Sequence, residues 1–122
     1  SMPSAVRGAE GGARPDFILG DRYGTSCAQP LVDAAAEILT GLGYRVSRNK
    51  PYAGGFITEH YGRPLKGLHA LQIEINRGLY MDEGLTLRGP GFENLVQDLT
   101  RFADALVAIP DQEFYPDALA AE

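Results

Sequence analysis

The stretch DFILGDRYGTSCAQPLVDAAAEILTGLGYRVS, residues 16–47, indicates the fold class of this 122-residue chain. Residues 16–19 form a short apolar run that ends in Gly-Asp, which is typical of a buried strand followed by a turn. Apolar side chains then recur at helical intervals over about residues 27–42. Gly43 can supply the left-handed stop of that helix, and residues 44–47 alternate as in a strand. Strand, helix and strand in succession predict an α/β domain.

The rest of the chain adds one clear strand and one clear helix. Residues 68–76 alternate between apolar and polar side chains, which predicts a strand with one polar face. Residues 92–108 carry a wide apolar stripe at helical spacing and predict a second helix. Residues 56–59 could form another short strand, and Ser26 followed by Gln29 has the spacing of a capping box at the start of the first helix. We therefore expect a layered sheet flanked by helices.

The size and composition fit a single domain spanning residues 1–122, in which the Gly-rich residues 1–15 form a flexible loop or tail. The net charge of -5, from 11 basic and 16 acidic residues, argues against a nucleic-acid partner. No apolar run approaches the roughly 20 residues of a membrane-spanning helix, so we expect no membrane partner. The single cysteine, Cys27, suits a reducing compartment and favours the cytoplasm.

Glu74 is the candidate catalytic residue. Alternation in its strand places its carboxylate on the face opposite to Ile73 and Ile75, in a strand that is otherwise apolar enough to be buried. A carboxylate that is partly removed from water can act as a proton shuttle. The pattern alone also allows Glu74 to be an ordinary residue at the rim of a half-exposed strand.

A substrate-binding region is predicted on either side of this strand. Arg77 follows where the strand would end, and its guanidinium could bind a carboxylate through two parallel hydrogen bonds. Alternatively it is an exposed strand-end residue, or it pairs with Asp82 or Glu83. The loop at residues 49–55 could bring an amide, a phenol and backbone NH groups to a ligand, or could be an ordinary turn between two strands. Its candidate binding residues are Asn49, Tyr52, Gly54 and Gly55.

Neither the histidines nor the cysteine predict a metal site. His60 and His69 are nine positions apart and lack the close pairing of zinc-hydrolase motifs, so we assign His60 to a loop or rim and His69 to a structural role. Cys27 lies at the start of a helix but has no convincing His partner, which argues against a nucleophilic role. Asp21 and Arg22 either shape the wall of a pocket or make ordinary turn contacts, and we favour turn contacts.

Four motifs follow one another along the chain: DFILGDRYGTSC at residues 16–27, PYAGGF at 51–56, YGRP at 61–64 and QIEINR at 72–77. Together they resemble the N-formylglutamate amidohydrolase family, zinc hydrolases that are related in fold to the zinc carboxypeptidases. The resemblance implies a phosphorylase/hydrolase-like α/β fold, here in a partial version. It also implies hydrolysis of a small N-acyl amino acid, N-formyl-L-glutamate, to formate and L-glutamate in histidine degradation.

The same resemblance implies roles for particular residues. Glu74 would activate a zinc-bound water and then protonate the leaving nitrogen, while Arg77 and the loop at residues 49–55 would hold the substrate. In the related enzymes zinc is held by a His and an acidic residue from an early segment, and by a second His just before a Ser. Residues 1–4 resemble the residues that come directly after that second His. We therefore expect zinc in the intact family enzyme, but no zinc bound by this chain and no certain activity of the chain alone.

Two alternatives stay open. The first is a metal-free remnant that binds an acidic amino acid or acts as an interaction domain. The second is a chain that associates with itself, or that pairs with a missing N-terminal segment, because unpaired strand edges invite association.

Overall fold

The computed structural model describes residues 1–5 and 14–114. Its main sheet has three strands in the order β2-β1-β3, in which β1 is parallel to β2 and antiparallel to β3. The strands are β1 (Phe17–Gly20), β2 (Val46–Arg48) and β3 (Gln72–Ile75). A separate two-stranded ribbon consists of β4 (Met81–Asp82) and β5 (Leu87–Arg88).

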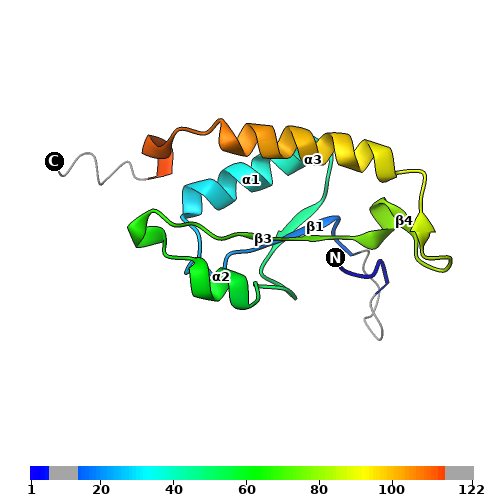
Figure 1. The fold of residues 1–122 in the computed structure, drawn as a ribbon, viewed down its shortest axis with the longest axis horizontal. Helices are drawn as coiled ribbons and strands as arrows, with labels where there is room; N and C mark the ends of the chain where they lie inside the picture. Colours follow the sequence, from blue (N-terminus) through cyan, green and yellow to red (C-terminus); the bar gives the residue numbers. More distant parts are fainter. Residues whose placement is uncertain (6–13, 115–122) are drawn as a thin grey trace.

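Three α-helices accompany the main sheet. They are α1 (Gln29–Gly41), α2 (Phe56–Tyr61) and α3 (Phe92–Val107). Helices α1 and α3 lie together on one side of the strands, whereas α2 lies on the other side (Figure 1). Three short 3-10 turns complete the described elements: η1 (Pro64–Lys66), η2 (Arg77–Leu79) and η3 (Asp111–Phe114). The predicted α/β class with a layered sheet is therefore confirmed.

The core lies between the sheet and the pair α1 and α3. Phe17, Ile18 and Leu19 of β1 are 0% exposed, as expected for a central strand with neighbours on both edges and cover on both faces. Alternate residues of β1 face opposite sides, and Phe17 and Leu19 belong to the core cluster on the helical side. The other buried members of that cluster are Cys27, Val32, Ala35, Leu39, Leu95 and Phe102.

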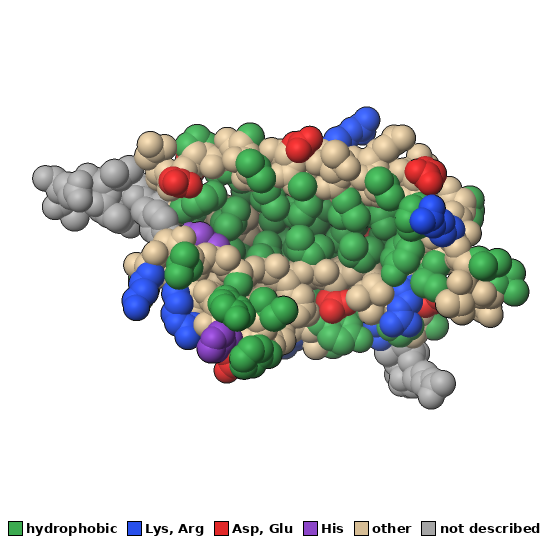
Figure 2. All heavy atoms as spheres, in the orientation of Figure 1, with side chains coloured by type: hydrophobic (Ala, Val, Ile, Leu, Met, Phe, Trp, Pro, Cys, Tyr) green, Lys and Arg blue, Asp and Glu red, His purple; other side chains and the backbone are tan. Residues whose placement is uncertain are grey.

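Strand β3 forms one edge of the sheet. Ile73 of β3 pairs with Leu19 of β1, and Ile75 pairs with Phe17. This register places both isoleucines on the core side of the sheet, where they pack against the core cluster. They are only partly buried, and Figure 2 shows hydrophobic side chains gathered in a band between α3 and the strand layer. The outer edge of β3 is contacted at its end by Met2, which forms a parallel bridge with Asn76. Among the described strands, β1 alone pairs with β3.

The start of α1 differs from the capping-box prediction, which is wrong. The helix begins at Gln29, and its N-cap residue Ala28 has no side-chain cap. The Ser26 hydroxyl instead donates to the carbonyl of Ala70 at 2.8 Å, and the backbone NH of Ala28 donates to His69 Nδ1 at 3.0 Å. The Ser26 hydroxyl thus binds the segment that leads into β3 and does not cap the helix. Local sequence spacing cannot reveal such a long-range contact.

The predicted short strand at residues 56–59 is also wrong, because these residues begin α2. The Thr58 hydroxyl donates to the carbonyl of Gly55 at 2.7 Å, and the backbone NH of Glu59 donates to the same carbonyl at 3.1 Å. Both bonds close a helical turn directly after the two glycines. A pattern four residues long cannot distinguish such a turn from a strand.

The other elements match their predictions with shifted ends. The strand predicted over residues 68–76 is confined to β3, and the helix predicted over residues 92–108 is α3. Gly43 follows α1 with a φ of 98°, the left-handed stop that was predicted. Within the predicted tail at residues 1–15, Met2 is 1% exposed, while residues 6–13 lie outside the described residues. Among the described residues, no helix combines the length and apolar character of a membrane span.

Candidate functional site

The loops that follow β1 and β2 meet because these strands are parallel and end at the same edge of the sheet. Asn49, with a φ of 63°, accepts hydrogen bonds at Oδ1 from the backbone NH groups of Asp21 (3.1 Å) and Tyr23 (3.4 Å). Its Nδ2 donates to Asp21 Oδ1 at 2.8 Å. The Asn49 amide therefore ties the two loops together. Its predicted contact with substrate stays a prediction.

The glycine loop, residues 51–55, crosses the end of β1 at very short range. A Cβ placed on Gly20 would lie 2.6 Å from the carbonyl carbon of Ala53 and 2.9 Å from the backbone nitrogen of Gly54. The backbone NH of Arg22 donates to the carbonyl of Ala53 at 2.8 Å. This close approach requires glycine at position 20 and fixes the glycine loop against the sheet.

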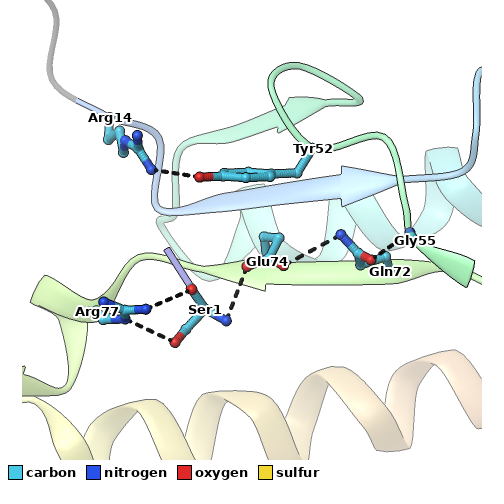
Figure 3. A network of polar contacts seen from close by, with 7 residues as sticks. All are labelled: Ser1, Arg14, Tyr52, Gly55, Gln72, Glu74 and Arg77. Atoms are coloured by element: carbon cyan, nitrogen blue, oxygen red, sulfur yellow. Dashed lines mark hydrogen bonds and ion pairs between the residues drawn. The ribbon is translucent and has the colours of Figure 1, made fainter. Parts of the chain in front are cut away.

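Glu74 lies on the face of β3 opposite to the core cluster, as the alternation predicts, and its Cα pairs with that of Ile18. Its side chain is 21% exposed. Gln72, on the same face, donates from Nε2 to Glu74 Oε1 at 3.4 Å and accepts at Oε1 from the backbone NH of Gly55 at 3.0 Å (Figure 3). Gln72 therefore links the carboxylate to the glycine loop, a positioning role that the sequence analysis missed.

The second oxygen of Glu74 faces Ser1. The α-amino nitrogen of Ser1 lies 3.1 Å from Glu74 Oε2, an ion pair that requires a free amino group at this residue; within a longer polypeptide the same atom would be an amide nitrogen. Arg77 approaches Ser1 from the other side, with Nε 3.3 Å from Ser1 Oγ and Nη2 3.4 Å from Ser1 O (Figure 3). Glu74 and Arg77 thus lie on either side of one short segment.

Arg77 itself lies in η2, directly after the strand end, where it was predicted. Among the ion pairs of residues 1–5 and 14–114, none joins Arg77 to Asp82 or Glu83, the two alternative partners considered above. Its guanidinium donates hydrogen bonds to Ser1. Hydrogen bonds from Ser4 lower the pKa of Glu83, and the positive charge of Arg77 adds to this effect. Binding of a substrate carboxylate by Arg77 stays a prediction.

The remaining candidates lie in the glycine loop. The half-buried Tyr52 accepts a hydrogen bond at its hydroxyl from Arg14 Nη1 at 3.4 Å (Figure 3). Gly54 has a φ of 122°, and its carbonyl accepts from Arg22 Nη1 at 3.0 Å. The backbone NH of Gly55, which was predicted to approach a ligand, is bound to Gln72. The loop is thus held by its neighbours, and its contact with a ligand stays a prediction.

The described residues do not fit a zinc site. In the described part of the chain no group of three or more His, Cys, Asp or Glu side chains could hold a metal ion. His60 stacks on Phe56 with ring centroids 5.0 Å apart, on the exposed side of α2. His69 accepts the hydrogen bond from Ala28 at the start of α1. These contacts agree with the rim and structural roles assigned to the two histidines.

Cys27 is buried in the core, and its thiol is kept protonated. Burial, with a smaller contribution from the negative charge of Asp21, raises the pKa of Cys27 to about 12. We expect a thiol-reactive disulfide reagent to label the folded chain at least roughly tenfold more slowly than the urea-unfolded chain, because only the thiolate reacts. The absorbance of the released thiol measures both rates. Equal rates would contradict the burial of Cys27.

His69 is expected to make the stability of the chain depend on pH. Burial lowers the pKa of His69 below 6.5, although Asp111 acts in the opposite direction. The folded chain therefore binds fewer protons than the unfolded chain, so stability is full above the ordinary pKa and is lost as the pH falls below it. Protonation at Nδ1 would also remove the acceptor for Ala28.

The urea midpoint of the chain should accordingly be lower at about pH 5.5 than at about pH 7.5. His69→Gln should reduce this difference, because an amide does not titrate in this range. His60→Gln, a change on the exposed side of α2, serves as the matched control and should leave the difference intact. A difference that persists in His69→Gln would assign the pH dependence to another group.

Comparisons with known proteins bear on this arrangement. The family model described as N-formylglutamate amidohydrolase matches residues 1–81. An N-formylglutamate deformylase of Pseudomonas aeruginosa is 44% identical over 74 residues, and one of Pseudomonas putida is 40% identical over 73 residues. Each of these matches covers 59% of this chain and 27% of the relative, so the chain spans about a quarter of the length of these curated relatives.

A solved structure is also similar. The crystal structure of an N-formylglutamate amidohydrolase from Ralstonia eutropha JMP134 has a TM-score of 0.76 and 40% sequence identity, and the match covers 88% of this chain and 39% of that one. The agreement in fold thus extends over most of the chain, beyond the 81 residues matched by the family model. On the strength of that match and of the shared fold, this chain belongs to the N-formylglutamate amidohydrolase family.

Proposed function

We propose that this chain is part of an amide hydrolase that converts N-formyl-L-glutamate and water to formate and L-glutamate. The observation that carries the proposal is Glu74, a carboxylate on the non-core face of β3 that is held by Gln72. Over 74 residues the chain is 44% identical to a protein named as a deformylase. The same resemblance favours a place in histidine degradation, and the single cysteine favours a cytoplasmic location.

Glu74 would act first as a general base and then as a general acid. Its carboxylate accepts a proton from the attacking water as the oxygen bonds to the formyl carbon, and then delivers that proton to the amide nitrogen as the C–N bond breaks. Gln72 would orient the carboxylate through its hydrogen bond to Oε1, which leaves Oε2, the oxygen that faces Ser1, for the proton transfer. Such a group contributes roughly two to four orders of magnitude to the rate.

Substrate binding is assigned to the remaining candidates. Arg77 would bind a carboxylate in place of its contacts with Ser1, and the glycine loop would cover the formamide with Tyr52. Asn49 would act by holding that loop in position against Asp21. Because the described residues offer no group of three metal ligands, we place the zinc ligands of the family outside them and assign no step of the reaction to zinc.

The test is formate release from N-formyl-L-glutamate by a chimera in which this chain replaces the matching segment of the Pseudomonas aeruginosa relative. We expect formate release by the chimera and by the unmodified relative, and loss of release from both when a chelator removes zinc. Circular dichroism and a thermal melt verify that the chimera is folded. A folded chimera that releases no formate, beside an active relative, would contradict the proposal.

A second candidate function is zinc-independent binding of an acidic amino acid, favoured by the missing donor group among the described residues. Titration calorimetry of the chain with L-glutamate, with and without a chelator, tests it: equal binding in both conditions and no formate release from N-formyl-L-glutamate would support it. Zinc-dependent formate release by the chain itself would reject it.

We also propose that the edge of β3 pairs with another extended segment, either from the remainder of the protein or from a second copy. The backbone NH of Met2 donates to the carbonyl of Ile75 at 2.9 Å, and Met2 O accepts from the NH of Arg77 at 2.8 Å, so one residue already pairs there in parallel. Sedimentation across a range of concentrations tests association with a second copy. A constant monomer mass would exclude it.

A further inference from the structure

A pocket of about 620 Å³ lies beyond the end of β1, and its wall includes Arg22, for which the sequence analysis favoured turn contacts over a place in a pocket wall. One wall is the loop that follows β1, including Arg22, and the other is the turn from α2 into η1, including Glu59, Arg63 and Lys66. The walls are held together tightly, since a Cβ on Gly62 would lie 2.6 Å from the Cα of Ser26. The pocket is therefore a fixed feature of this packing.

The pocket carries more positive than negative charge. Three of its lining side chains are cationic and one, Glu59, is anionic. Arg22 Nη2 lies 3.4 Å from Glu59 Oε1, which leaves Arg63 and Lys66 without a carboxylate partner among the ion pairs of the described residues. Arg63 uses Nη1 to donate to the carbonyls of Glu59 (3.0 Å) and Gly62 (2.7 Å). Figure 2 shows Lys and Arg side chains gathered at the end of the molecule where α2 lies.

The pocket is connected to Glu74 by a short series of hydrogen bonds. Arg22 donates to the carbonyl of Gly54, the next residue Gly55 donates to Gln72, and Gln72 donates to Glu74. The pocket also lies beyond the carboxyl end of β1, since the loop that directly follows this strand forms one of its walls. Loops at the carboxyl ends of strands are a common place for ligand binding in α/β folds.

We propose that this pocket binds the side-chain carboxylate of an acidic N-acyl amino acid, through Arg63 and Lys66. A guanidinium with free donors and an ammonium can both bind one carboxylate with charge-assisted hydrogen bonds. The apolar lining residues Pro64 and Leu65 suit the methylene groups that precede that carboxylate. The proposal rests on the proposed function, and it gives that function a basis for preferring glutamate over glutamine derivatives.

The test compares two probes that differ only in this charge, N-formyl-L-glutamate and N-formyl-L-glutamine, by titration calorimetry with the 122-residue chain. We expect tighter binding of the glutamate probe, and a loss of that preference by about tenfold or more in the double variant R63Q/K66Q. The double variant R88Q/R101Q, which removes two exposed cations from β5 and α3, is the matched control and should keep the preference.

The single variant Lys66→Gln is a second test that should not disturb the fold. The Lys66 ammonium has no hydrogen-bond or ion-pair partner among the residues that the structure describes. Its preference for glutamate should also fall while its thermal melt stays unchanged. Unchanged preference in both folded variants would overturn the proposal, as would equal binding of the two probes by the unmodified chain.

The same variants in the chimera separate this proposal from the proposed function. Formate release with an unchanged preference for N-formyl-L-glutamate over N-formyl-L-glutamine would overturn the pocket assignment and leave the hydrolase intact. Binding of the glutamate probe that depends on Arg63 and Lys66, in a folded chimera without formate release, would support the pocket and reject the hydrolase.

Discussion

Replacing Glu74 with Gln is expected to lower the turnover of N-formyl-L-glutamate by roughly two to four orders of magnitude in the chimera with the Pseudomonas aeruginosa relative. An amide cannot accept the proton of the attacking water, so both proton transfers assigned to this residue would be lost. The size of the side chain is conserved, and the Gln72 contact can be kept because the amide oxygen is also an acceptor. The turnover number at saturating substrate measures the effect.

The matched control is Glu37→Gln, which makes the same chemical change on the exposed side of α1. Its turnover should stay close to that of the unmodified chimera. Both variants should unfold at similar temperatures, so that a lower rate in Glu74→Gln reports chemistry and not unfolding. A fall of less than about tenfold would reassign Glu74 to a structural role at the edge of the sheet.

Gly20→Ala is expected to destabilise the chain by about 1–3 kcal/mol, the usual range for overpacking a close contact. The added methyl would lie 2.6 Å from the carbonyl carbon and 2.7 Å from the carbonyl oxygen of Ala53, and both neighbours are backbone atoms. The glycine loop would have to move away from β1. The hydrogen bond from Gly55 to Gln72 would then lengthen and loosen the position of Glu74. Urea unfolding measures the loss of stability.

Gly41→Ala is the matched control for this substitution. Gly41 is the last residue of α1, and a Cβ placed there would meet nothing within 4 Å. Alanine has the higher helix propensity, so this variant should be as stable as the unmodified chain or more stable by up to about 1 kcal/mol. Equal unfolding midpoints for Gly20→Ala and Gly41→Ala would show that the glycine loop does not pack as tightly as described.

The fold could be predicted from the sequence where a pattern is long and regular. The apolar stripes of α1 and α3 extend over 13 and 16 residues, and both helices are found close to their predicted positions. Helix α2 has six residues, too few for a helical period to appear, and was mistaken for a strand. The predicted capping box of α1 was wrong for a different reason: the Ser26 hydroxyl donates a hydrogen bond to the carbonyl of Ala70, a residue 44 positions away.

The candidate site could be predicted only in part. Alternation along β3 was enough to place Glu74 on the face opposite to the core. The role of Gln72 could have been suspected, because it lies two residues before Glu74 and shares its face, but its bond to Gly55 depends on how the glycine loop packs. The cationic pocket joins Arg22 to Arg63 and Lys66, which lie about 40 positions apart in the sequence, so no local pattern reveals it.

The most direct test of the account is the rate of formate release from N-formyl-L-glutamate, measured side by side for the unmodified chimera and its Glu74→Gln variant. Protein mass, folded fraction and added zinc must be equal in the two samples. The account predicts steady release by the unmodified chimera and a rate lower by at least roughly a hundredfold in the variant. Equal rates from two folded samples would contradict it, because the reaction would then proceed without the carboxylate on which the proposed function rests.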